Sequence, residues 1–202
     1  EMKQFKKFSF EYDLLDSKQL AYKLTANSIY GQMGSKYSQV FKKEIAESTT
    51  AIGREQLKIA RDFVKVPSNY NNYFSEYNLK YYEMKNTVVY GDTDSIFVKF
   101  DARDEKCNIL SDKEALVKSI HIAEWTEKQI GEQELESPQI LEYEKTFYPF
   151  ILLGKKKYIG MKYENANDNP KQSNMGVVLK RRDNALILKI IYDSIINKLI
   201  TE

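Results

Sequence analysis

Two runs of β-forming residues around a short acidic turn constrain the fold of this chain more than any other feature. Residues 86–89 (NTVV) and 96–100 (IFVKF) enclose the turn sequence YGDTDS at residues 90–95. This pattern predicts a β-hairpin with two carboxylates, Asp92 and Asp94, at its tip. Side chains two positions apart in an extended segment face the same way, so these carboxylates would crowd together unless a cation holds them.

The acidic turn allows two interpretations. Oxygen ligands with no His or Cys nearby favour Mg²⁺ or Mn²⁺ over zinc, which makes the hairpin a candidate metal site. The alternative is a solvated turn built from ordinary turn residues. Because short acidic motifs are common, the rest of the chain has to decide between the two.

Composition narrows the possible classes of function. With 202 residues, of which 42% are hydrophobic, the chain can form one large domain or parts of two. The net charge of +2 means that any binding of nucleic acid must come from local basic clusters. The single Cys107 excludes a disulfide framework and a multi-cysteine zinc site. The single His121 is expected to be a surface or structural residue.

The apolar runs of the sequence indicate the cellular compartment of the chain, and its first residue indicates whether it is a fragment. The sequence contains no signal peptide and no apolar run long enough to cross a bilayer. A reduced intracellular compartment is therefore the default expectation. The chain opens on Glu1 rather than Met, which indicates a fragment or an excised domain.

A helix predicted at residues 16–31 carries an unusual polar face. Lys23, Asn27 and Tyr30 recur at intervals of four and three residues, so they share one face of that helix. An ordinary amphipathic helix also places polar residues in a row. Asn and Ser are poor residues for a helix interior, however, and Asn27 is followed by Ser28, which indicates a functional surface.

The rest of the chain alternates between helical and extended patterns. We expect a helix at 111–130 that begins with a capping box and turns Trp125 away from its core face. A Tyr/Asn-rich segment at 68–78 is expected to form a loop. The other predicted elements are a helix at 42–64, strands at 141–153, 159–163 and 177–179, a basic turn at 154–158, a polar loop at 164–173, and a terminal helix from residue 180 with Ile187, Ile190, Ile191 and Ile195 on its apolar face.

Five segments, in this order, resemble motifs of the family B DNA polymerases. Residues 23–31 (KLTANSIYG) are similar to motif B on a fingers helix, and residues 90–95 are similar to motif C in the palm. Residues that flank the first motif look most like delta-type replicative enzymes of eukaryotes and large DNA viruses. Residues 141–149 resemble a palm segment, 155–158 (KKKY) match the basic KKxY motif, and 181–184 resemble the palm-to-thumb junction.

The resemblance implies an α+β fold. An antiparallel palm sheet with packing helices would carry Asp92 and Asp94, next to part of the helical fingers and the start of the thumb. The implied domains are the C-terminal part of the fingers at residues 1–34, the palm at 35–176 and the start of the thumb at 177–202.

The activity that the resemblance implies is DNA-templated DNA synthesis by two-metal-ion transfer of a nucleotide from a dNTP to a primer 3′-hydroxyl. Asp94 would bind two Mg²⁺ ions, for which Mn²⁺ can substitute, and Asp92 would lie beside them as a weaker partner. Lys23 is the third catalytic candidate, as a proton donor to the leaving pyrophosphate. Glu144 is a candidate ligand of an accessory metal, and an ordinary solvated strand residue is an equally good alternative for it.

Further residues are implied to bind the substrates. The nucleotide-binding candidates, all in the motif B segment, are Lys23, Asn27, Tyr30 and Gly31. The candidates for holding the primer–template duplex are Lys155, Lys156, Tyr158, Arg181 and Arg182. The implied partners are primer–template DNA, a dNTP, and a sliding clamp or processivity factor that binds outside these residues, with no membrane. The implied location is the nucleus or a viral replication site in the host cytoplasm.

Departures from the family's pattern limit what these residues would do alone. Motif A, which supplies the other catalytic Asp, and the proofreading exonuclease are absent from the sequence. We therefore expect the fragment to bind DNA weakly and not to polymerise by itself.

Two rival functions are open to the sequence. A non-catalytic DNA-binding module, such as an inactivated polymerase relative, would retain the basic turn at 155–158 and lose the acidic pair, yet the chain has both. A purely structural assembly domain would leave the polar face of Lys23, Asn27 and Tyr30 unexplained.

Overall fold

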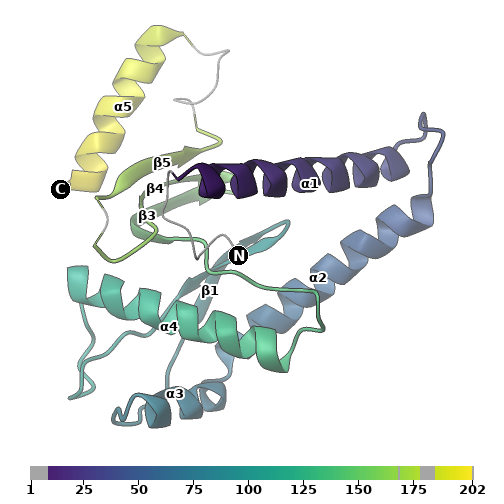
Figure 1. The fold of residues 1–202 in the computed structure, drawn as a ribbon. Helices are drawn as coiled ribbons and strands as arrows, with labels where there is room; N and C mark the ends of the chain where they lie inside the picture. Colours follow the sequence, from purple (N-terminus) through teal and green to yellow (C-terminus); the bar gives the residue numbers. More distant parts are fainter. Residues whose placement is uncertain (1–8, 168, 178–184, 202) are drawn as a thin grey trace. The chain divides into compact units, whose positions relative to one another are not determined.

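The computed structural model describes residues 9–167, 169–177 and 185–201 (Figure 1). The chain divides into two compact units, residues 1–55 and 56–202, and each is described by itself. None of the helices in the described part of the chain combines the length and the apolar character that a membrane-spanning helix needs.

The first unit is dominated by α1, which spans Phe10–Gly34. Ser9 caps this helix, since its hydroxyl accepts a hydrogen bond from the Tyr12 N–H at 3.2 Å. The predicted start at residue 16 is therefore wrong, because an earlier capping residue satisfies the first turn. The helix also continues past Gly31, and its residues remain exposed or half-buried.

The second helix, α2, spans Lys43–Lys65 and contributes to both units. Its position confirms the predicted helix at 42–64. Its last turns bury Ala60, Phe63 and Val64 in a cluster that also contains Ile130. These three residues are the buried residues of α2, and the rest of the helix is exposed or half-buried.

The segment predicted to be a loop at 68–78 is helical, and that prediction is wrong. It forms a 3₁₀ helix, η2 (Pro67–Tyr70), and a short α-helix, α3 (Asn71–Glu76). Tyr70, Tyr73 and Phe74 are all buried there. Burial of large aromatic rings outweighs the weak helix propensity of the Asn and Ser residues between them.

The fourth helix, α4, spans Asp112–Gln133 and packs against two different neighbours (Figure 1). Ile122 and Trp125 join the cluster around α3, whereas Ile130 joins the cluster around α2 and the hairpin. Trp125 is only 4% exposed, which overturns the prediction that it lies away from the core. Its indole N–H donates to Glu76 at 2.8 Å, so the buried ring keeps a polar partner.

The N-terminus of α4 and the residue His121 on it were both subjects of predictions from the sequence. Its N-terminus lacks the predicted capping box, because the Ser111 side chain makes no capping hydrogen bond. His121 is a structural residue, as predicted, since its Nδ1 forms a 2.9 Å hydrogen bond with the Tyr73 hydroxyl.

The described strands form two small antiparallel sheets, so the α+β class and the antiparallel pairing are confirmed. The expectation of a single sheet is wrong: the acidic hairpin forms a sheet of its own. The hairpin strands are β1 (Thr87–Asp92) and β2 (Ser95–Lys99). The second sheet has the order β3-β4-β5, with β3 at Thr146–Gly154, β4 at Lys157–Tyr163 and β5 at Lys171–Met175.

The C-terminal strands and helix differ from expectation in two respects. The last strand among the described residues is β5, whose residues 171–173 were predicted to belong to the loop at 164–173. The strand predicted at 177–179 lies outside the described residues except for Val177. The last helix, α5, spans Leu186–Thr201 and packs through Ile196 against Ile159 and Val177. The residues predicted to form its apolar core face are instead exposed: Ile187, Ile190, Ile191 and Ile195.

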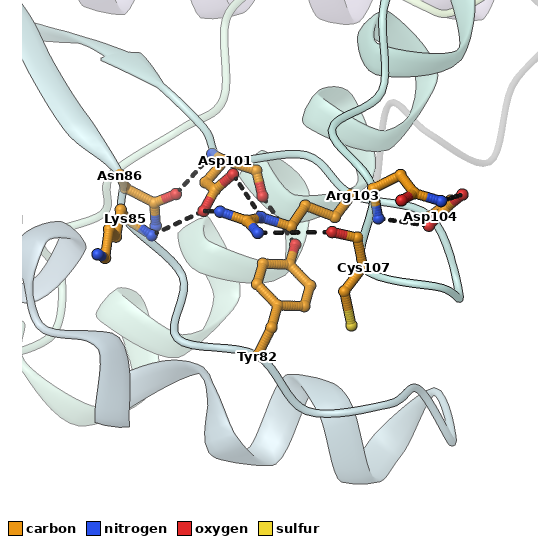
Figure 2. A network of polar contacts seen from close by, with 8 residues as sticks. Tyr82, Lys85, Asn86, Asp101, Arg103, Asp104 and Cys107 are labelled. Carbon is orange, nitrogen blue, oxygen red and sulfur yellow. Dashed lines mark hydrogen bonds and ion pairs between the residues drawn. The ribbon is translucent and has the colours of Figure 1, made fainter.

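A polar network ties the segment before β1 to the segment after β2 (Figure 2). The Asp101 carboxylate accepts hydrogen bonds from the Arg103 guanidinium at 2.9 and 3.0 Å and from the Lys85 N–H at 3.1 Å. The backbone carbonyl of Asp101 accepts a hydrogen bond from the Tyr82 hydroxyl at 2.7 Å. The backbone N–H of Asp101 donates a hydrogen bond to the Asn86 side chain at 3.0 Å. The network therefore closes the base of the hairpin.

This network predicts a pH-dependent contribution to stability. Burial alone would raise the pKa of Asp101, but the hydrogen bonds from Arg103 and Lys85 outweigh burial and hold that pKa below its usual value. A lowered folded-state pKa stabilises the fold above the unfolded-state pKa of about 3.9, and this contribution is lost as the pH falls through the folded-state value.

We expect Asp101→Asn to lower the free energy of unfolding by about 1–3 kcal/mol at pH 7, because it weakens charge-assisted hydrogen bonds. The difference from the native chain should shrink as the pH falls below about 4, where the native carboxylate also becomes protonated. Urea unfolding followed by circular dichroism across this pH range measures both effects. A difference that stays constant down to pH 2 would contradict the assignment.

Candidate functional site at the acidic hairpin

The tip of the hairpin has a fixed backbone geometry. Asp92, at the end of β1, pairs with Ser95 at the start of β2, so Thr93 and Asp94 form a two-residue turn. Thr93 has a φ of 49°, in the left-handed region that tight hairpin turns use. The Asp94 N–H and the Ser95 hydroxyl both donate to the Asp92 carbonyl, at 2.5 and 3.1 Å.

The Asp92 carboxylate has the counter-charge that the sequence analysis required, and the chain itself supplies it. The Lys156 ammonium lies 2.7 Å from Asp92 Oδ1 and donates a second hydrogen bond to the Thr93 hydroxyl at 3.2 Å. The hydrogen bond from Lys156 holds the pKa of Asp92 below its usual value, and the same contact raises the pKa of Lys156. Asp92 is thus ionised and oriented, whereas Asp94 is exposed to solvent.

Lys156 is held in place by its backbone as well as by its charge. It lies in the turn between β3 and β4 with a φ of 58°, and its N–H donates to the Tyr90 hydroxyl at 2.7 Å. On the other side, a Cβ on Gly176 would lie 2.0 Å from the Lys156 carbonyl oxygen. The absence of a side chain at Gly176 therefore lets the backbone after β5 pass directly against this turn.

A cluster of aromatic rings joins the hairpin to the three-stranded sheet. Phe97 of β2 lies 5.5 Å from Phe150 of β3 and 5.3 Å from Tyr158 of β4, measured between ring centroids. Phe147 and Tyr90 complete the cluster. The cluster was not predicted from the sequence, although aromatic residues recur along β1, β2 and β3.

The predicted DNA-binding residues have different surroundings. Lys155 is exposed in the turn, next to Lys156. Tyr158 is only 7% exposed and packs within the aromatic cluster, so its contact with a duplex stays a prediction. Arg181 and Arg182 lie outside the described residues.

The predicted nucleotide-binding residues belong to the first unit. Lys23, Asn27, Tyr30 and Gly31 all lie on α1 and are exposed. The hairpin and the basic turn belong to the second unit. The structure thus brings Asp92 and Lys156 together, and the role of the α1 face stays a prediction.

The carboxylates at the hairpin fit part of a divalent-cation site. Asp92 and Asp94 offer the hard oxygen ligands that Mg²⁺ prefers. Among the described residues, however, no group of three or more His, Cys, Asp or Glu side chains could hold a metal ion. Glu144 precedes β3, at the opposite end of that strand from Lys156, and forms an ion pair with Lys145 at 2.5 Å. The metal roles of Asp92, Asp94 and Glu144 therefore stay predictions.

Comparison with known proteins identifies the family to which the chain belongs. The profile of DNA polymerase family B matches residues 1–202, so the chain belongs to that family. The chain is 49% identical over 187 residues to a DNA polymerase of Pyramimonas orientalis virus, and this alignment covers 93% of the chain. It is 35% identical to the DNA polymerase delta catalytic subunit of Plasmodium falciparum and 31% identical to that of Candida albicans, over 94% and 96% of the chain. The aligned regions span only 14–17% of the length of these relatives.

The contact between Gly176 and the basic turn predicts a large effect of a small substitution. Gly176→Ala should lower the free energy of unfolding by about 1–3 kcal/mol, because the added methyl overlaps the Lys156 carbonyl and the φ of 63° strains an L-residue. Gly131→Ala is the matched control, since Gly131 lies in α4 with open space around it. That control should raise stability by roughly 0.5–1 kcal/mol. Equal effects of both substitutions in denaturant unfolding would refute the close contact.

Proposed function

We propose that this chain is a segment of the catalytic core of a DNA-directed DNA polymerase. In the proposed reaction, a primer 3′-hydroxyl attacks the α-phosphate of a dNTP paired with the template, and pyrophosphate leaves. The observation that carries the proposal is the acidic hairpin of Asp92 and Asp94 held against the basic turn of Lys155 and Lys156. Membership of DNA polymerase family B supports it.

The proposed roles of the hairpin residues follow from their chemistry. Two divalent ions, Mg²⁺ or Mn²⁺, lower the pKa of the attacking hydroxyl and neutralise charge on the leaving pyrophosphate in reactions of this class. Asp94 is the proposed principal ligand, because its carboxylate is exposed at the tip of the hairpin. Asp92 is the proposed weaker partner, since Lys156 already compensates part of its charge. Glu144 is proposed only as a ligand of an accessory ion.

The exposed face of α1 is proposed to bind the incoming nucleotide. Lys23 offers a positive charge to the triphosphate, and Asn27, one helical turn later, offers hydrogen-bond donors. Lys23 is also the proposed proton donor to the leaving pyrophosphate. Tyr30 and Gly31 would lie beside the nascent base pair, where a flat ring can respond to its shape.

The basic turn is proposed to hold the primer–template duplex. Lys155 and Lys156 would contact phosphates, which gives position without sequence preference. Tyr158 would support the turn through the aromatic cluster and reach the duplex with its hydroxyl end. Arg181 and Arg182 would extend the same contact along the duplex.

The proposal extends to the parent protein. Residues 1–34 would be the end of the fingers, 35–176 the palm and 177–202 the start of the thumb. A sliding clamp or processivity factor would bind elsewhere in the protein, which would work in the nucleus or at a viral replication site in the host cytoplasm. The 202 residues alone would not extend a primer, because the site needs a further carboxylate beyond the two in the hairpin.

If the hairpin binds the metal ions, a change at Asp94 should lower the rate of primer extension without changing the affinity for duplex DNA. In the full-length polymerase, Asp94→Asn should lower primer extension by roughly 10³-fold or more, because transition-state charge loses its stabilisation. Duplex affinity should change less than about twofold, as measured by fluorescence anisotropy, since the turn that contacts phosphates is intact. Asp62→Asn, on the exposed face of α2, is the control and should extend primers normally. Normal extension by the Asp94 variant would refute the proposal.

The two basic surfaces predict different kinetic defects. Lys23→Ala should raise the KM for dNTP by roughly tenfold or more and leave duplex affinity unchanged, because a charge-assisted hydrogen bond to phosphate is lost. Lys155→Ala should weaken duplex binding and reduce its salt slope by about one unit, with the KM for dNTP little changed. Steady-state kinetics and anisotropy at several salt concentrations separate the two. Identical defects in both variants would contradict the division of roles.

A further inference from the structure

The Lys156 ammonium contacts two oxygen atoms at the tip of the acidic hairpin. Its Nζ contacts the Asp92 carboxylate at 2.7 Å and the Thr93 hydroxyl at 3.2 Å. Carboxylate and hydroxyl oxygens can also serve as ligands of a hard divalent cation. The lysine therefore contacts oxygen atoms of the same kind that a metal ion at the hairpin would use.

The backbone around Lys156 positions its ammonium for the contact with Asp92. An exposed lysine normally gains little from an ion pair, because it loses side-chain entropy when it is fixed. Here the backbone of Lys156 is already fixed by its hydrogen bond to Tyr90 and by its close approach to Gly176. The ammonium thus starts close to Asp92, although 68% of the Lys156 side chain remains exposed. Because the backbone of Lys156 is fixed and most of its side chain is exposed, the ammonium can leave the carboxylate without any rearrangement of the turn.

We propose that Lys156 is a resident counter-cation of the hairpin, which a divalent ion displaces from Asp92 when it binds. This inference rests on the proposed function and adds to it a competition between the ammonium and the metal. The displaced ammonium then becomes available for a phosphate of the duplex. Because linkage is reciprocal, DNA that holds Lys156 should favour metal binding at the hairpin to the same degree.

The competition predicts that removal of the lysine charge tightens metal binding. The test uses the full-length polymerase without DNA or nucleotide, and Mn²⁺ alone as the probe, with free Mn²⁺ measured by electron paramagnetic resonance. The binding that Asp94→Asn removes defines the hairpin site. Lys156→Met should lower the Kd of that site by about three- to fivefold, the factor that an exposed ion pair supports.

Two further variants keep the test decisive. Lys156→Gln should shift the affinity in the same direction as Lys156→Met, which guards against an effect of one side chain on folding. Lys157→Met removes a charge from the adjacent position, which is also exposed, and should leave the Kd within about 1.5-fold because no ion pair is lost. Circular dichroism confirms that each variant is folded.

The outcomes separate the inference from the proposed function. Tighter Mn²⁺ binding in both Lys156 variants, but not in Lys157→Met, supports the competition. Unchanged or weaker binding in the Lys156 variants overturns it, as does equal tightening in all three. If Asp94→Asn removes no Mn²⁺ binding at all, the proposed metal role of the hairpin fails, and the inference fails with it.

Discussion

The contact of one lysine with one hairpin connects the two sheets at the site. Lys156 reaches β1 in two ways, since its N–H bonds to the Tyr90 hydroxyl and its ammonium pairs with Asp92. The turn that carries Lys156 and the turn that carries Asp94 are therefore placed by the same small set of bonds. Any displacement of one turn changes the charge environment of the other.

Apolar packing provides the rigid support for these polar bonds. Rings from β1, β2, β3 and β4 meet in one cluster, with Phe97 in contact with four of them. Behind the hairpin, Val88, Ile96 and Val98 pack on the cluster formed by α2 and α4. Because interiors are close-packed, the hairpin cannot shift without disturbing its neighbours on both faces. The Asp101 network closes its open end (Figure 2).

Local sequence signals predicted the parts of the structure that depend on local chemistry. The hairpin tip, α2 and the basic turn were predicted because β-forming residues, apolar periodicity and turn residues act over a few positions. The segment at 141–145, predicted as the start of a strand at 141–153, alternates between exposed and half-buried residues, yet the strand begins only at Thr146. Alternation reports which side chains face the core, and it does not require strand pairing.

Features that depend on distant contacts were missed. Tyr73 and Trp125 are far apart in sequence, and only their meeting in one cluster explains why residues 71–76 are helical and why Trp125 is buried. The pairing of Asp92 with Lys156 joins residues 64 positions apart, so the charge pattern suggested that a counter-charge was needed but not where it came from. The role of Gly176 could not be predicted from the sequence either, because its close approach to Lys156 depends on the three-dimensional structure.

We propose that the hairpin of Asp92 and Asp94 is the metal-binding part of a polymerase active site. Anomalous diffraction from crystals of the full-length enzyme with Mn²⁺, a primer–template duplex and a non-reactive dNTP analogue tests it most directly. We expect an anomalous peak within coordination distance of the Asp94 carboxylate, with the Lys156 ammonium no longer in contact with Asp92. Bound nucleotide and Mn²⁺ at a place remote from the hairpin would contradict it.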